Sequence, residues 1–296
     1  MIFFSIIIIT RNRADTITRT LDTVKKLEYY EDKLEIVVVD NGSTDNTRVV
    51  VEQELKNSGI NFKIVVEEVK GICRARNKGV EVASGEWLLF LDDDVFVSAD
   101  LLKVYLQAQS IYPDAAAFGG PARLDPEIPR PWWWIPDFEK SMSCQNYGDE
   151  YREYPKWTNP YGLNMLIRRN KLRELNGFDE RLDKLTNSFA DETEYFLRLA
   201  GIGGQLIYVP DAEVIHSVMP DRLNWKNFMN RYTLVGKSHA CLDCMHNTYF
   251  FRPLSRRMAS SLIHFIKSGS PAVFFTEIYA WNGYRKFIAS NAGFHI

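Results

Sequence analysis

The sequence lacks a long hydrophobic run, a strong net charge and a cysteine framework. No uninterrupted apolar stretch in its 296 residues approaches the roughly 18 residues that cross a bilayer as a helix, so we expect no transmembrane helix. A net charge of −2, from 36 basic and 38 acidic residues, predicts no nucleic-acid partner. Four irregularly spaced cysteines favour a reducing compartment over a disulfide scaffold, and we therefore expect a cytoplasmic protein.

The first residues also lack the pattern of a signal peptide. The apolar run at 2–9 has no basic segment before it and no small-residue cleavage site after it, and Arg11 and Arg13 follow it instead. A signal peptide has its basic segment first. We interpret this run as the first buried strand of a sheet.

Apolar and turn-forming segments alternate along residues 1–120. We predict strands at 4–10, 35–39, 62–66 and 87–91, which are nearly continuous apolar runs of the kind that is buried on both faces. Helices are predicted between them, the first with Asp15 as its N-cap. This βαβ series predicts an α/β fold with a mostly parallel central sheet and helices on both faces.

Polar side chains follow three of the predicted strands, and in such sheets ligands bind beyond the carboxyl ends of the strands. The residues concerned are Thr10, Arg13, Asp40, Asp92, Asp93 and Asp94. Three adjacent carboxylates repel one another, so a cation must offset their charge, and a hard divalent ion that carries phosphates suits this arrangement. The sequence therefore predicts a metal and nucleotide site at one edge of the sheet.

The character of the chain changes after residue 120. Prolines surround Trp132, Trp133 and Trp134, which indicates either a packed loop or an aromatic wall for a sugar ring or a lipid. We predict a strand within 159–168, a helix beginning at Asp191, short strands at 205–209 and 212–216, and helices from residue 224 onward.

Several short segments, in this order and spacing, resemble glycosyltransferase family two. They are IIITRNR at 7–13, VVDNGSTD at 38–45, GICRARNKG at 71–79, FLDDD at 90–94, GLNM at 162–165, GFDE at 177–180, DETEYFLR at 191–198, and His216. The resemblance implies a GT-A (Rossmann-like) catalytic domain at 1–220, with a nucleotide-binding half at 1–120 and an acceptor half at 121–220. Residues 221–296 would form a helical C-terminal extension.

The resemblance also implies the activity. The enzyme would be an inverting, metal-dependent glycosyltransferase that moves a sugar from a nucleotide-diphosphate sugar, UDP first among the nucleotides, to an acceptor hydroxyl. The acceptor would be a glycan or a lipid-linked molecule in the synthesis of a surface polysaccharide or glycolipid. Asp94 and His216 would bind Mn²⁺ or Mg²⁺. The nucleotide-sugar site would comprise Thr10, Arg13, Asp40, Arg76, Asp92, Asp93 and Asn164.

The chain departs from the family pattern at the catalytic base, the carboxylate that takes the proton from the acceptor hydroxyl. The family usually has Glu-Asp, whereas this chain has Asp191-Glu192. Alignment on the Tyr-Phe-Leu-Arg that follows places Glu192 at the base position and Asp191 before it, and both remain candidates. A carboxylate base that does not itself attack the sugar implies direct displacement with inversion at C1.

The C-terminal extension carries two further patterns. No acidic residue lies between Asp243 and Glu277, whereas Arg252, Arg256, Arg257 and Lys267 do. With apolar residues at helical spacing, this pattern indicates either a helix on an anionic membrane surface, hence peripheral attachment to the inner face of the plasma membrane, or an ordinary packing helix. The segment 239–246 has two cysteines and two histidines, but no second cysteine pair to complete a common zinc module.

Two other classes of protein fit parts of the pattern. A nucleotidyltransferase typically has a glycine-rich loop after its first strand, and residues 10–15 contain no glycine. A non-catalytic sugar-nucleotide-binding protein would fit the reversed Asp191-Glu192 pair.

Overall fold

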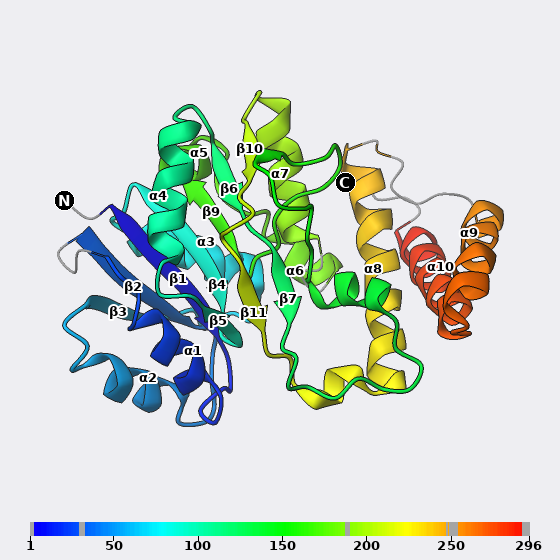
Figure 1. Cartoon of the computed structure of the whole chain (residues 1–296), viewed down its shortest axis with the longest axis horizontal. Helices are drawn as coiled ribbons and strands as arrows, with labels where there is room; N and C mark the ends of the chain where they lie inside the picture. The colour runs from blue at the N-terminus through cyan, green and yellow to red at the C-terminus, as the bar shows by residue number, and fades with distance from the viewer. Residues whose placement is uncertain (1–2, 30–32, 187–189, 247, 249–253, 292–296) are drawn as a thin grey trace.

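The computed structural model describes residues 3–29, 33–186, 190–246, 248 and 254–291 (Figure 1). A central eight-stranded sheet has the order β3-β2-β1-β4-β9-β6-β10-β8. The first four strands in this order are parallel, and β9 runs antiparallel to both its neighbours. This confirms the predicted mixed α/β fold with a mostly parallel sheet.

The first part of the chain follows the predicted alternation closely. Its elements include β1 (Phe4–Thr10), α1 (Ile17–Val24), β2 (Leu34–Asp40), α2 (Thr47–Leu55), β3 (Asn61–Val66), α3 (Ile72–Val82), β4 (Trp87–Asp92) and α4 (Leu101–Ile111). The prediction that Asp15 caps α1 is wrong, because the N-cap position is Thr16 and no side chain caps the helix.

The remaining strands complete the main sheet and add a smaller one. The main sheet takes β6 (Ala117–Gly119), β8 (Arg152–Glu153), β9 (Met165–Arg168) and β10 (Leu206–Tyr208), and the second sheet has the order β5-β11-β7, with β5 (Val95–Val97), β7 (Ala122–Leu124) and β11 (Val214–His216). Short helices connect them: η2 (Pro136–Met142), α5 (Arg169–Glu174), α6 (Arg181–Leu185), α7 (Asp191–Gly201) and η3 (Pro220–Leu223).

The central strands are apolar throughout because helices cover both faces of the sheet. Alternate residues of β1 belong to different cores: Ile6 and Ile8 pack in the cluster with α1, α2 and α4, whereas Ile7 packs in the cluster with α3 and α7. This division follows from the two-residue repeat of a strand.

Three long helices form the C-terminal region: α8 (Trp225–His246), α9 (Leu254–Ser268) and α10 (Ala272–Ser290). The helices α8 and α10 cross closely, because a Cβ on Gly236 would collide with the backbone of Ala280, and one on Gly283 with that of Thr233. In Figure 1, α8 lies between the central sheet and the α9–α10 pair. No helix among the described residues is long and apolar enough to cross a membrane.

The tryptophan loop packs against α8. Trp133 is 6% exposed and contacts Phe228 of α8 with ring centroids 4.9 Å apart, while Trp132 is 88% exposed. None of the tryptophans 132–134 lines the large cavity described below. For Trp133, the packed-loop interpretation is therefore the one that the structure supports.

Candidate active site

The acidic residues 92–94 lie where β4 ends and the chain turns into β5. Asp92 is the last residue of β4 and pairs in register with Ile9 of β1, while Thr10 pairs with Asp40 of β2. The parallel strands thus bring Thr10, Asp40 and Asp92 to one edge of the sheet, as predicted. His216 joins them because β11 pairs with β5, which places His216 beside Val95.

Asp92, Asp94 and His216 form a candidate metal site. One ligand atom from each lies within 4.8 Å of the others. His216 is 2% exposed, and its Nδ1 lies 2.7 Å from the carbonyl oxygen of Met142. Because a carbonyl only accepts hydrogen bonds, Nδ1 must carry the proton, which leaves the lone pair of a neutral ring on Nε2.

That Nε2 atom has no hydrogen-bond partner and faces Asp94, with 3.2 Å between Nε2 and Oδ1. Two buried electron-pair donors at this distance repel unless a proton or a metal ion lies between them. The chemistry of these three side chains fits a divalent cation of the Mn²⁺ or Mg²⁺ type, and Asp94 and His216 occupy the predicted ligand positions. Asp92, which was predicted for the nucleotide-sugar site, lies with them.

Burial and the neighbouring charges shift the pKa values of Asp92, Asp93 and Asp94. Burial and the charge of Asp94 raise the pKa of Asp92. Burial also acts to raise the pKa of Asp94, but His216 with a proton on Nε2 and the charge of Arg222 outweigh it, and the pKa of Asp94 is lowered. Burial and the neighbouring Asp94 raise the pKa of Asp93 to about 7. The carboxylates therefore disfavour one another's ionised forms, as expected of a site that needs a cation.

The other residues of the predicted nucleotide edge are held by internal contacts. Arg13 donates from Nε to Asp93 at 3.3 Å, and Asp93 is not part of the Asp92, Asp94 and His216 group. Asp40 is 1% exposed, accepts a hydrogen bond from the amide of Ser43 at 2.9 Å and lies 3.1 Å from Nε of Arg48. Contact of Thr10, Arg13, Asp40 and Asp93 with a nucleotide stays a prediction.

The candidate bases lie in the first turn of α7. Asp191 is 1% exposed and forms an ion pair with Nη1 of Arg76, whereas Glu192 is 18% exposed and pairs with Nη2 of the same guanidinium at 3.0 Å. Arg76 comes from α3, and the structure places it against both carboxylates. Glu192 Oε1 also accepts the amide hydrogen of Gly162 at 2.9 Å. A Cβ at Gly162 would collide with Arg76 and Glu192, so this close approach requires glycine.

Asn164 lies inside the protein. It is 1% exposed, accepts a hydrogen bond from the hydroxyl of Tyr105 at 2.6 Å and donates one to the carbonyl of Ala212 at 2.7 Å. It is not among the residues that line the cavity. These contacts join α4, β9 and the segment before β11, and a sugar contact for Asn164 stays a prediction.

A cavity of about 930 Å³ borders the candidate metal site and the candidate bases, and both halves and α8 contribute to it. Asp92 and His216 line it, as do Arg76, Asp191 and Glu192. Its other polar lining residues were not predicted from the sequence, and they include Lys140, Tyr147, Trp157, Arg222, Arg231 and Tyr232. No local motif marks these residues, because long-range packing brings α8 and the 140–160 segment to the cavity.

Two of these residues add positive charge near the metal cluster. Arg222 Nη1 lies 3.7 Å from Asp94 Oδ2. Burial and the charge of Arg222 lower the pKa of Arg231 to about 10, while the negative charges of Asp92 and Glu192 act to raise it. Arg231 thus lies within electrostatic reach of both the metal cluster and the candidate base.

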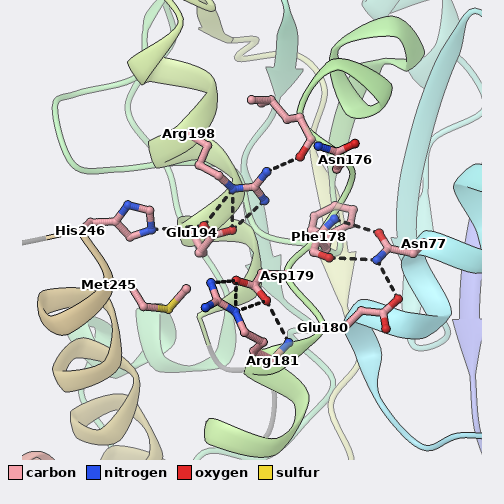
Figure 2. A pocket seen from close by; sticks show the side chains of 11 residues that line it. Asn77, Asn176, Phe178, Asp179, Glu180, Arg181, Glu194, Arg198, Met245 and His246 are labelled. Carbon is pink, nitrogen blue, oxygen red and sulfur yellow. Dashed lines mark hydrogen bonds and ion pairs between the residues drawn. The ribbon is translucent and has the colours of Figure 1, made fainter. Parts of the chain in front are cut away.

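Behind the candidate base, a polar cluster anchors α7 (Figure 2). Figure 2 shows Glu194 between Arg198 of its own helix and His246, the last residue of α8. The Arg198 guanidinium also donates to the backbone carbonyls of Leu175 and Gly177. These contacts fix the helix whose first turn carries Glu192.

The cysteine and histidine segment at the end of α8 does not form a metal site in the described part of the chain, where Asp92, Asp94 and His216 are the group found. Cys241 is buried against Met245, Cys244 is exposed, and His246 contacts Glu194. Helix geometry accounts for this, since the spacing places the two cysteines on one side of α8 and the two histidines on the other.

The whole fold is similar to solved glycosyltransferase structures. A mannosyltransferase from Pyrobaculum calidifontis, in complex with GDP-Man and Mn²⁺, matches with a TM-score of 0.63 and 20% identity over 98% of this chain and 74% of that one. Residues 1–349 of TarS from S. aureus match with a TM-score of 0.58 and 16% identity over 98% and 91%. The fold and the site define a glycosyltransferase of the GT-A class.

The sequence comparison identifies the family. Residues 5–175, more than half of the chain, match the family described as Glycosyl transferase family 2, and the chain belongs to this family. A glucosyl-dolichyl phosphate glucuronosyltransferase of Haloferax volcanii is 24% identical over 79% of this chain and 74% of its own length. Glycosyltransferase AglE of the same organism is 41% identical, but the match spans only 31% of this chain and 30% of AglE.

Proposed function

We propose that this protein is an inverting, metal-dependent glycosyltransferase that uses a nucleotide-diphosphate sugar as its donor. The observation that carries the proposal is one cavity that combines the Asp92, Asp94 and His216 cluster with the partly exposed carboxylate of Glu192. The first group suits a cation that holds a diphosphate, and the second suits a base for an acceptor hydroxyl.

Glu192 is the proposed base. Asp191 is fully committed to a buried ion pair with Arg76, whereas Glu192 reaches the cavity and is oriented by Arg76 and the Gly162 amide. Its carboxylate takes the proton of the acceptor hydroxyl as the oxygen bonds to the sugar C1. The bond between C1 and the diphosphate oxygen breaks with its electron pair, and attack from the opposite face inverts the configuration.

Asp92, Asp94 and His216 would hold Mn²⁺ or Mg²⁺. When bound, the ion supplies positive charge that stabilises the departing diphosphate. Arg222 lies beside Asp94, and Arg231 lines the same cavity. Both place further positive charge near the cluster, where a diphosphate develops negative charge.

We propose UDP as the nucleotide of the donor. TarS has been solved with UDP and with UDP-GlcNAc, whereas the Pyrobaculum enzyme was solved with GDP-Man. These neighbours are under 25% identical to this chain, so they support a nucleotide-sugar donor and leave GDP as the second nucleotide to test.

The proposed acceptor is a glycan or a lipid-linked molecule of a surface polysaccharide or glycolipid pathway, reached from the cytoplasmic side of the membrane. The Haloferax glucuronosyltransferase is named for a glucosyl-dolichyl phosphate, which is a lipid-linked sugar. The outer helices support the same proposal, because Leu262, Ile263 and Ile266 of α9 are 51%, 56% and 74% exposed. With the basic, acid-free segment 244–276, this face fits peripheral contact with an anionic membrane.

The test is turnover by single carboxylate variants. With a panel of UDP- and GDP-sugars and Mn²⁺, we expect Glu192→Gln to lower donor hydrolysis or transfer by about 100-fold or more, the usual range for loss of a general base. Nucleotide binding should persist. Glu150→Gln, at a side chain that is 86% exposed, is the matched control.

Full activity of Glu192→Gln would overturn the assignment of the base and move it to Asp191. If the unaltered protein binds a donor but neither hydrolyses nor transfers it, the chain is a non-catalytic binding protein.

A further inference from the structure

A second hollow lies between α6, α8 and α10, outside the catalytic cavity. Its volume is about 590 Å³. The residues that line it are Lys184, Leu185, Asn230, Thr233, Leu234, Lys237, Lys286, Phe287, Ser290 and Asn291. We call it the lysine pocket, because one lysine from each of the three helices contributes to it.

The lysine pocket has positive charge and no carboxylate in its lining. The ammonium groups of Lys184, Lys237 and Lys286 make no hydrogen bond or ion pair with any residue in the part of the chain that the structure describes. Other lysines of the same chain do find acidic partners, such as Lys25 with Glu54 at 2.7 Å. Three like charges around one hollow repel one another, which an anionic ligand would relieve.

The remaining lining suits a phosphate group. The α8 residues of the pocket, Asn230, Thr233 and Lys237, follow the spacing of one helix face and present an amide, a hydroxyl and an ammonium group. Asn291 and Ser290 of the α10 end add another amide and hydroxyl. These are hydrogen-bond donors without a negative charge, and lysine binds phosphate as a point charge.

The pocket adjoins the catalytic cavity. On α6, Asp183 lines the cavity and Lys184 lines the pocket; on α8, Val235 and Ser238 line the cavity, whereas Leu234 and Lys237 line the pocket. The same two helices therefore border both hollows. The two hollows lie on different faces of these helices, so an elongated acceptor whose hydroxyl enters the cavity would reach the pocket around them.

We propose that the lysine pocket binds a phosphate group of the acceptor substrate. The proposal rests on the proposed glycosyltransferase function and names the acceptor class, a phosphate-bearing molecule. The phosphate belongs either to a lipid headgroup or to a soluble phosphorylated glycan, and its recognition is the same in both.

The test compares the unaltered full chain with the triple variant Lys184→Gln, Lys237→Gln, Lys286→Gln. Its matched control is Lys26→Gln, Lys56→Gln, Lys103→Gln, which removes the same charge from exposed positions in the nucleotide-binding half. One arm measures binding of inorganic tripolyphosphate by calorimetry in EDTA. The other measures co-sedimentation with phosphatidylcholine vesicles with and without phosphatidic acid.

We expect the pocket variant to lose at least about tenfold in affinity for one or both probes, because each lysine near an anionic group contributes to binding, and the control to bind like the unaltered chain. Loss in the vesicle arm assigns a lipid phosphate, and loss in the tripolyphosphate arm alone assigns a soluble one. Equal binding by both variants and the unaltered chain would overturn the proposal, as would equal loss in the control.

Thermal shift with UDP and Mn²⁺ is measured for the same three proteins. It distinguishes failure of the proposed glycosyltransferase function from failure of the proposed phosphate site. It should be unchanged in the pocket variant. If no protein in the set binds a nucleotide, the proposed function fails, whatever the phosphate arms show.

Discussion

At the scale of single residues, a buried arginine gives two adjacent carboxylates different surroundings. Arg76 is 3% exposed and neutralises Asp191 while it orients Glu192, so two adjacent acids receive different tasks. The sequence predicted both acids as candidates, but it could not separate them, because the separation depends on a guanidinium more than a hundred residues away. A buried arginine between two acids is stable only when each charge has a partner.

Glu35, a buried carboxylate outside the candidate active site, also has partners for its charge. Glu35 is 3% exposed on β2 and is held by the Ser5 hydroxyl, the Ser84 amide and Lys63, whose Nζ lies 2.8 Å away. Burial acts to raise the pKa of Glu35, but these partners together lower the pKa below its ordinary 4.5. A lowered pKa stabilises the fold above that range, and this contribution is lost as the pH falls through the folded-state pKa.

We therefore expect Glu35→Gln to lower the free energy of unfolding by about 2 kcal/mol at pH 7, since it leaves part of a buried network unpaired. The difference from the unaltered chain should shrink as the pH falls to the lowest value at which both proteins fold. Urea unfolding across this pH range measures it, with Glu81→Gln, at a side chain that is 67% exposed, as control. A difference that stays constant with pH would contradict the assigned cause.

At the scale of elements, the C-terminal helices have two roles that the sequence pattern did not separate. The helix α8 lines the catalytic cavity and packs closely on α10, so both belong to the core of the molecule. The helix α9 lies at the outside of the molecule in Figure 1. Its side chains Leu262, Ile263 and Ile266 are exposed. Removing everything after residue 243 would therefore break the core, and only point changes on α9 test membrane contact cleanly.

We predict that Ile263→Glu with Ile266→Glu weakens binding to vesicles that contain phosphatidylglycerol by at least about tenfold, because it removes apolar contact and adds repulsion from anionic lipid. Vesicle flotation measures this effect. The control, Val49→Glu with Ile111→Glu, changes side chains that are 52% and 49% exposed on α2 and α4, and should float like the unaltered chain. Failure of the unaltered chain to float would refute the membrane proposal.

At the scale of the whole molecule, the cavity joins parts that fold from distant segments. The acidic cluster comes from β4, the histidine from β11, the candidate base from α7, and part of the wall from α8. Ligand binding should therefore stabilise the protein globally, since a ligand that binds only the native state shifts the folding equilibrium.

We expect UDP with Mn²⁺ to raise the melting temperature by several degrees, from about 2.7 kcal/mol of stabilisation at a hundredfold excess over Kd. UDP in EDTA should raise it far less, and Asp94→Asn should abolish the effect of Mn²⁺ on the shift. Differential scanning fluorimetry with UDP and GDP, each with and without metal, gives the measurement. A shift that is independent of metal would argue against the cluster as a cation site.

The sequence by itself determined the strands and helices of the first part of the chain and the edge of the sheet where Thr10, Asp40 and Asp92 gather. Buried parallel strands need continuous apolar runs, and polar residues at their carboxyl ends then have one place to gather. Tertiary structure alone decided which carboxylates meet His216, that Arg76 pairs with Asp191 and Glu192, and that α8 completes the cavity. These contacts join segments far apart in the chain, and their partners follow from how helices and strands pack, which no local pattern encodes.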